Sequence, residues 1–215
     1  MLDTLNKSVF SMKVIGAVLT PSEAIQTYLR AKDQNRPHLM KLVFAEAAKL
    51  EMTVDTGAIS FPPVTIGVDE ITRVLVRDFG QVYENVYTFC LTNPPASSAD
   101  TFACRWIVGM SEKKTGTVRL GCGHYDWTFQ ISGPHLVDKL GIAIKTMLVL
   151  PPECLQPVMD WLSALPYPWC RPSEAVRGMP SLAAMEDVRK FIVEPWQGTK
   201  VERPPRAYPR DGAGR

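Results

Sequence analysis

"TVRLGCGHYDWTFQI", residues 117–131, determines the expected fold, because polar and aromatic side chains alternate along it from His124 onward. In an extended strand, successive side chains point to opposite faces of the sheet. One face would carry the aromatic rings of Tyr125, Trp127 and Phe129. The other face would carry the polar groups of Cys122, His124 and Asp126. The stretch therefore predicts a strand with one face in the core.

Three other stretches share this period of two, and segments rich in turn-forming residues separate them. They cover residues 81–92, 101–112 and 135–148. Earlier in the chain, apolar residues recur at helical spacing. Helices are expected over residues 20–37, 38–49 and 68–80, with a strand at 50–56. Three N-terminal helices followed by a mostly antiparallel sheet predict an α+β domain.

Composition divides the chain into four expected parts. Residues 1–19 form an N-terminal arm, and residues 20–150 form the α+β domain. Most of the 18 prolines lie after residue 150, but residues 151–196 still carry apolar side chains at helical spacing. They predict a helical C-terminal extension packed outside the main domain, because so much apolar surface is unstable in water. Residues 197–215 hold too few apolar residues to pack, so we expect a disordered tail.

The charge and cysteine content exclude several classes of partner. A net charge of +2 is too small to favour nucleic acid or an anionic membrane. No apolar run reaches the roughly 20 residues that a membrane-spanning helix needs. The five cysteines form no C-x-x-C pair, and their odd number argues against a disulfide framework. We therefore expect five reduced thiols and a cytoplasmic location.

Neither a cofactor nor a metal ion is expected. The sequence contains no glycine-rich dinucleotide-binding motif, no P-loop and no H-E-x-x-H motif. Cys122, His124 and Asp126 are three possible metal ligands on one strand, but their spacing matches no zinc pattern.

The order of segments through residue 150 resembles the nuclear transport factor 2-like superfamily, in particular its SnoaL-like branch. The resemblance is carried by residues 28–52, 67–79, 102–110 and 121–129. It implies a curved, mostly antiparallel sheet wrapped over three helices, forming a cone with an apolar pocket. It also implies that two copies pair through the outer face of the sheet, so we expect a homodimer.

The resemblance also implies candidate site residues. Tyr28 falls where ketosteroid isomerase has its oxyanion-hole tyrosine, and Tyr125 falls where that enzyme has its second oxyanion-hole acid. Met52 stands at the position of the general-base aspartate, and a methionine cannot accept a proton. The side chains expected to contact a substrate in the pocket are Met52, Phe79, Trp106, Trp127 and Phe129.

Two orientations of the strand at residues 117–131 stay open. The aromatic face can line the pocket, in which case His124 and Asp126 point outward. A one-residue bulge would reverse the faces, and bulges are common in curved sheets. His124 would then be the natural proton acceptor, with Asp126 orienting it. The candidate catalytic set is therefore Tyr28, Tyr125, His124 and Asp126.

Two functions remain open at this stage. The first is an isomerase, cyclase or dehydratase that acts by proton transfer on a hydrophobic small molecule. The second is a ligand-binding or association module that uses the same pocket without turnover. The missing acid at Met52 favours the second function, whereas the two phenols of Tyr28 and Tyr125 favour the first.

Overall fold

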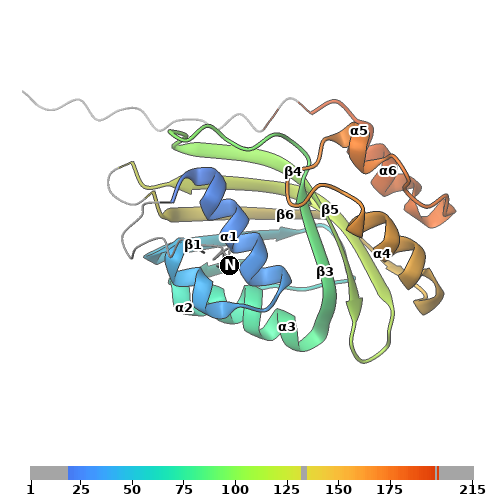
Figure 1. Cartoon of the computed structure of the whole chain (residues 1–215). Coiled ribbons are helices and arrows are strands. Elements are labelled where there is room, and N and C mark those ends of the chain that lie inside the picture. Colours follow the sequence, from blue (N-terminus) through green and yellow to red (C-terminus); the bar gives the residue numbers. More distant parts are fainter. Residues whose placement is uncertain (1–18, 132–134, 197, 199–215) are drawn as a thin grey trace, which may run out of the picture.

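The computed structural model describes residues 19–131, 135–196 and 198 (Figure 1). Within them, six strands form one sheet in the order β2-β1-β6-β5-β4-β3. The strands are β1 (Phe44–Val54), β2 (Val64–Ile66), β3 (Tyr83–Cys90), β4 (Thr101–Glu112), β5 (Val118–Phe129) and β6 (Val137–Leu150). Neighbouring strands are antiparallel except β1 and β6, which are parallel. The expected α+β fold with a mostly antiparallel sheet is confirmed.

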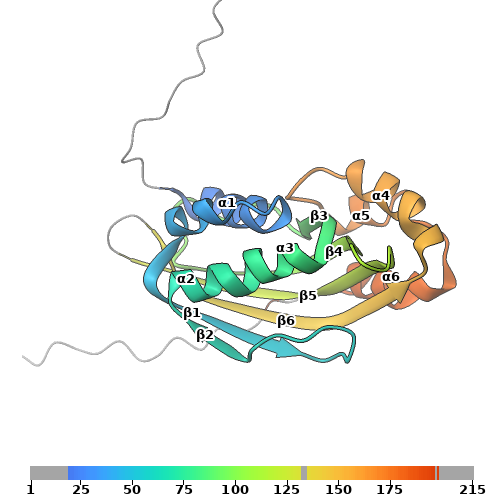
Figure 2. The same cartoon turned by 90° about the horizontal axis from the view of Figure 1, so that it is seen from below.

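Two helical segments cover one face of the sheet (Figure 2). The first is α1 (Pro21–Asp33), which begins at a capping box. The hydroxyl of Thr20 accepts a hydrogen bond from the backbone N–H of Glu23, and the Glu23 carboxylate accepts one from that of Thr20. The second is a continuous helix made of α2 (Val68–Thr72), the π-helical η2 (Arg73–Asp78) and α3 (Phe79–Val82). Both segments match helices expected from the sequence.

The helix expected over residues 38–49 is wrong. A short 3₁₀ helix, η1 (Pro37–Leu42), is followed almost directly by β1. Strand β2 lies between the expected strand at 50–56 and the expected helix at 68–80, where no element was expected. The register between β1 and β6 shifts between Phe44 and Lys49. This irregularity breaks the period of two, so the buried residues of the strand imitate helical spacing. Pairing with β2 and β6 outweighs the helical preference of the three alanines and of Glu46.

Strand β5 keeps its aromatic face toward α1. Tyr125, Trp127 and Phe129 are 3%, 1% and 2% exposed, and the rings of Tyr28 and Trp127 are 5.3 Å apart. The register shifts between β5 and β6 leave Lys145 and Asp138, both on β6, without a partner on β5. Because the extra residues belong to β6, the alternation along β5 is not reversed, and its aromatic face points inward while His124 and Asp126 lie on the other face.

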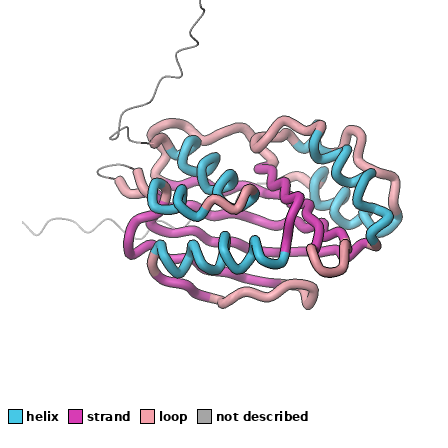
Figure 3. Tube along the Cα trace, turned by 60° about the horizontal axis from the view of Figure 1, so that its bottom comes forward, coloured by secondary structure: helices cyan, strands magenta, loops and turns pink. Residues whose placement is uncertain are grey.

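The C-terminal extension packs against the opposite face of the sheet. Its helices are η3 (Pro152–Cys154), α4 (Leu155–Ser163), α5 (Pro172–Ala175), η4 (Ala183–Met185) and α6 (Glu186–Val193). They gather at one end of the sheet (Figure 3). A second apolar cluster joins them to β4 and β5, and it includes Ile107, Leu120, Val158, Leu162 and Ile192. The extension therefore covers part of the outer face of the sheet.

The remaining expectations concern the thiols and the chain ends. All five cysteines are free, and four of them are buried. No helix in the described part of the chain has the length and apolar character needed to cross a membrane. The expected N-terminal arm and disordered tail lie almost wholly outside the described residues.

Candidate functional site

A small cavity lies between the inner face of the sheet and the helices, and we call it the inner cavity. Its volume is about 50 Å³. Most of its wall is apolar and includes Ile59, Phe61, Leu75, Phe79, Ile142 and Ile144. Polar side chains also reach the wall, namely Tyr28, Lys32, Thr88, Trp106 and Tyr125. The inner cavity is therefore an apolar space with a few polar groups directed into it.

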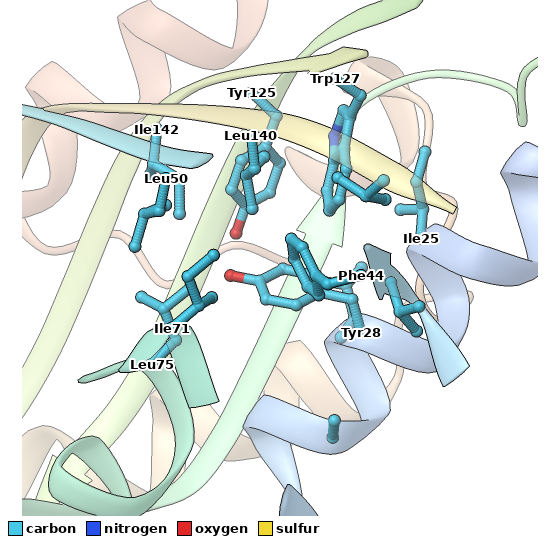
Figure 4. Close-up of a cluster of buried hydrophobic side chains, with 14 of the residues drawn as sticks. Ile25, Tyr28, Phe44, Leu50, Ile71, Leu75, Tyr125, Trp127, Leu140 and Ile142 are labelled. Carbon is cyan, nitrogen blue, oxygen red and sulfur yellow. The ribbon is translucent and has the colours of Figure 1, made fainter. Parts of the chain in front are cut away.

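Tyr28 and Tyr125 bring two phenols together at this wall. Their ring centroids are 6.3 Å apart in an edge-to-face arrangement, and Figure 4 shows both hydroxyl groups directed into the same space. The two side chains are 0% and 3% exposed. Burial raises the pKa of each phenol far above its ordinary value. Both groups are therefore neutral hydrogen-bond donors at physiological pH.

Lys32 is a buried cation at the same wall, and the sequence-based predictions missed it. Its ammonium donates to Asp33 Oδ1 at 2.6 Å and to Thr88 Oγ1 at 2.8 Å, and it lies 5.1 Å from the centre of the Phe79 ring. The signal that could have found it is its position four residues after Tyr28, which places both side chains on one face of α1.

Asp33 compensates the charge of Lys32. Its side chain is 2% exposed. Besides Lys32, it accepts hydrogen bonds from the backbone N–H of Thr88 at 2.8 Å, the Thr88 hydroxyl at 2.9 Å and the Tyr167 hydroxyl at 3.0 Å. This carboxylate is fully hydrogen-bonded, as a charge buried in protein must be. Each of its two oxygens already accepts two hydrogen bonds.

The polar groups of the inner cavity act as donors. The hydroxyl of Tyr28 and the indole N–H of Trp106 are buried without a hydrogen-bond partner among the described residues. Lys32 carries three N–H bonds, two of which are directed to Asp33 and Thr88. The Thr88 hydroxyl is occupied by Lys32 and Asp33. An occupant of this space therefore meets donors that need an acceptor.

A larger outer cavity adjoins the inner one. Its volume is about 500 Å³, and it lies between the loop at residues 57–62 and the helix α2–η2–α3. Three side chains line both spaces, namely Ile59, Phe61 and Phe79. They form the partition between the two cavities.

Several solved structures are similar to this chain. A ketosteroid isomerase-like protein from Catenulispora acidiphila is 15% identical, with a TM-score of 0.45, over 58% of this chain and 85% of that protein. A nuclear transport factor 2-like protein from Salmonella enterica is 15% identical, with a TM-score of 0.45, over 58% and 88%. A putative isomerase from Rhodopseudomonas palustris is 10% identical, with a TM-score of 0.47, over 57% and 86%. The sequence matches no protein-family model and no curated protein.

The resemblance implies a mostly antiparallel sheet over three helices, and the structure has such a sheet with two helical segments on one face. The sheet packs against α1 and the α2–η2–α3 helix, and the inner cavity lies between them. A fold does not determine a reaction, so the chemistry of the site depends on its own residues.

The four catalytic candidates lie in two separate places. Tyr28 and Tyr125 meet at the inner cavity, whereas His124 and Asp126 lie on the opposite face of β5. The His124 ring is 5.4 Å from the ring of Phe191 and 5.7 Å from that of Trp196, both in the C-terminal extension. The structure therefore does not bring His124 or Asp126 to the phenols.

The expected substrate-binding residues also divide into two groups. Met52, Phe79 and Trp106 line the inner cavity. Trp127 and Phe129 pack in the core beside Tyr28 and do not reach the cavity wall. Among the residues that the structure describes, no cluster of His, Cys, Asp and Glu side chains could hold a metal ion.

Proposed function

We propose that this protein binds a small, neutral, apolar molecule that carries a carbonyl group, with the carbonyl oxygen held by Tyr28 and Tyr125. The observation that carries the proposal is the set of donors on an otherwise apolar wall. Tyr28 and Trp106 have buried donors without a partner in the described structure. A buried donor without a partner costs about 1–3 kcal/mol, which a ligand acceptor would recover.

The charge balance favours a neutral ligand. Lys32 is already compensated by Asp33 at 2.6 Å. A ligand carboxylate would therefore place a second negative charge beside Asp33 in a space with little water. Burying a charge without a free partner costs several kcal/mol. A ketone or aldehyde meets the same donors without that cost.

The size of the ligand follows from the two cavities. The inner cavity, at about 50 Å³, is smaller than the roughly 300–1,000 Å³ typical of ligand pockets. The outer cavity, at about 500 Å³, provides the missing room. A ligand of one or two rings would place its carbonyl in the inner cavity and its apolar end beyond the partition. Side chains of the partition, Phe61 foremost, would turn aside on binding.

Catalysis by proton transfer is the second candidate, and the paired phenols favour it. Two donors directed at one oxygen would stabilise an enolate as well as a ketone, as in an oxyanion hole. An isomerase, cyclase or dehydratase would also need a base near the ligand. Met52 cannot serve, and Lys32 is held by Asp33. We therefore place binding before turnover.

Three ligands of the same shape test the proposal by fluorescence titration. These are 2-acetylnaphthalene, 2-naphthoic acid and 2-ethylnaphthalene, which carry a ketone, a carboxylate and no acceptor. We expect the ketone to bind most tightly. Tyr28→Phe and Tyr125→Phe should each weaken its binding about tenfold, since one hydrogen bond contributes about 1 kcal/mol or more.

Tyr87→Phe is the matched control, because Tyr87 packs in the apolar cluster on the other face of the sheet. It should leave the affinity for the ketone unchanged. If 2-ethylnaphthalene or 2-naphthoic acid bound as tightly as the ketone, the proposed recognition of a neutral carbonyl would be wrong. If the ketone showed exchange of its α-protons with solvent deuterium in the wild type alone, catalysis would take precedence over binding.

A further inference from the structure

The C-terminal extension reaches the sheet next to the polar residues of the inner cavity. Its segment around residues 167–170 runs beside the end of β3. The backbone N–H of Cys90 donates to the carbonyl of Pro168 at 2.8 Å, and the N–H of Cys170 donates to the carbonyl of Cys90 at 3.0 Å. These two bonds fix the segment two residues beyond Thr88 on the same strand.

Tyr167 crosses from this segment to α1. Its ring packs edge-on against Phe89, with centroids 5.7 Å apart. Its hydroxyl donates to Asp33 Oδ2 at 3.0 Å. Tyr167 is 40% exposed, and its partial burial together with the charge of Asp33 raises the pKa of the phenol, which stays protonated. The extension thus supplies one of the donors that hold this carboxylate.

The four donors are divided evenly between the two oxygens of Asp33. Oδ2 accepts from the backbone of Thr88 and from Tyr167, and Oδ1 accepts from Lys32 and from the Thr88 hydroxyl. Two donors on each oxygen fix the plane of the carboxylate. The position of Oδ1 in turn determines where the Lys32 ammonium lies on the cavity wall.

We propose that Tyr167 is a positioning residue of the cavity, because through Asp33 it fixes the ammonium of Lys32 at the ligand-facing wall. The C-terminal extension is then part of the site, although none of its residues lines the inner cavity. The effect on a ligand rests on the proposed binding function. The effect on Lys32 is a property of the protein without ligand, so the two can be tested apart.

NMR of the lysine side chains in the full-length protein gives the first test. The Cε and Nζ signals of Lys32 are compared in the wild type, in Tyr167→Phe and in the control Tyr87→Phe. The ring of Tyr87 also contacts Phe89, with centroids 6.5 Å apart, and in the described structure no hydrogen bond joins it to Asp33. We expect the Lys32 signals to shift in Tyr167→Phe and to stay unchanged in the control. Unchanged signals in Tyr167→Phe would overturn the proposal.

A second variant covers the case in which Tyr167→Phe does not fold. Site-specific 3-fluorotyrosine at position 167 keeps the ring and the hydroxyl and makes that hydroxyl a stronger donor. This substitution should also shift the Lys32 signals. If both variants fold, its shift should be opposite in direction to the shift seen in Tyr167→Phe. A protein with 3-fluorotyrosine whose Lys32 signals match the wild type would contradict the proposal.

Binding of 2-acetylnaphthalene gives the ligand-dependent test. We expect its affinity to fall at least threefold in Tyr167→Phe and to stay at the wild-type value in Tyr87→Phe. An unchanged affinity in Tyr167→Phe would remove the extension from the ligand site. If the wild type did not bind this ketone at all, the proposed function would fail, while the Lys32 signals would still decide the positioning role of Tyr167.

Discussion

Lys32 and Asp33 are adjacent residues of opposite charge, and both are buried at the end of α1. A buried pair of this kind is held by its hydrogen bonds as much as by its charges. Asp33 has three donors besides Lys32, whereas Lys32 has Asp33 as its one anionic partner in the described structure. Removing the Asp33 side chain should therefore destabilise the protein more than removing that of Lys32.

Asp33→Ala should destabilise the protein by about 3–5 kcal/mol, because it leaves the Lys32 ammonium buried without a counter-charge. Lys32→Met should cost less, since Asp33 keeps its donors from Thr88 and Tyr167. Urea unfolding of the two variants measures both values. A loss below about 1 kcal/mol for Asp33→Ala, or a larger loss for Lys32→Met, would show that the pair is not held as described.

His124 should make stability fall as the solution is acidified. Burial, followed by the positive charges of Lys145 and Arg105, lowers the pKa of His124, although Asp126 opposes the shift. A histidine whose pKa is lower in the folded state contributes fully above its unfolded pKa of about 6.5. This contribution to stability is lost as the pH falls from about 6.5 toward the pKa of His124 in the folded protein.

Urea unfolding at a series of pH values between neutral and mildly acidic measures this dependence. His124→Gln should flatten the slope in that window. A variant with the same slope as the wild type would mean that other groups cause the loss.

Part of the candidate site could be predicted from the sequence at the level of single residues. Tyr28 and Tyr125, which the resemblance implied as site residues, both line the inner cavity. Lys32 was missed because a lysine on an amphipathic helix is normally solvated. Its partner Thr88 is 56 residues away on β3, and Tyr167 is 134 residues from Asp33. Such long-range contacts leave no local pattern.

Among the elements, the strands with a regular period of two were the most predictable. The expected strand at 101–112 matches β4, and the alternation along β5 gave its buried face correctly. The segment at 38–49 failed because an irregular strand pairs on both sides, with β2 and with β6. The β2 strand was missed because three residues are too few to show a period.

The docking of α4 on β4 depends on a glycine. A Cβ atom at Gly109 would collide with the side chain of Leu162, which is fully buried. Gly109→Ala should therefore push α4 away from the sheet and destabilise the protein by about 1–3 kcal/mol. Gly57→Ala is the control, because nothing lies within 4 Å of the added atom. Thermal unfolding compares the two, and equal melting temperatures would contradict this packing.

For the molecule as a whole, the extension stabilises one end of the sheet from outside. The cluster that it covers includes Phe89, Ile107, Leu120 and Cys122. The outer face beyond the extension carries polar groups, among them Glu51, Thr53, Thr128 and Lys139. Pairing of two copies through this face stays a prediction, and so does a cytoplasmic location.

Truncation after Leu150 should expose the covered cluster and cause aggregation, since a contiguous apolar patch is unstable in water. Size-exclusion chromatography with light scattering measures the mass of the full-length and truncated chains. We expect a dimer for the full-length chain. A truncated chain that stays soluble at the same mass and melts at the same temperature would show that the extension is not needed for the fold.

The infrared spectrum of bound 2-acetylnaphthalene, labelled with ¹³C at its carbonyl, tests the central claim most directly. Hydrogen bonds from Tyr28 and Tyr125 would weaken the carbonyl bond and lower its stretching frequency. We predict a band well below that of the same ketone in an alkane solvent, returning toward the alkane value in the Tyr28→Phe/Tyr125→Phe variant. A bound ketone with its band at the alkane position, or a band that the double variant leaves unmoved, would contradict recognition of a carbonyl by the two phenols.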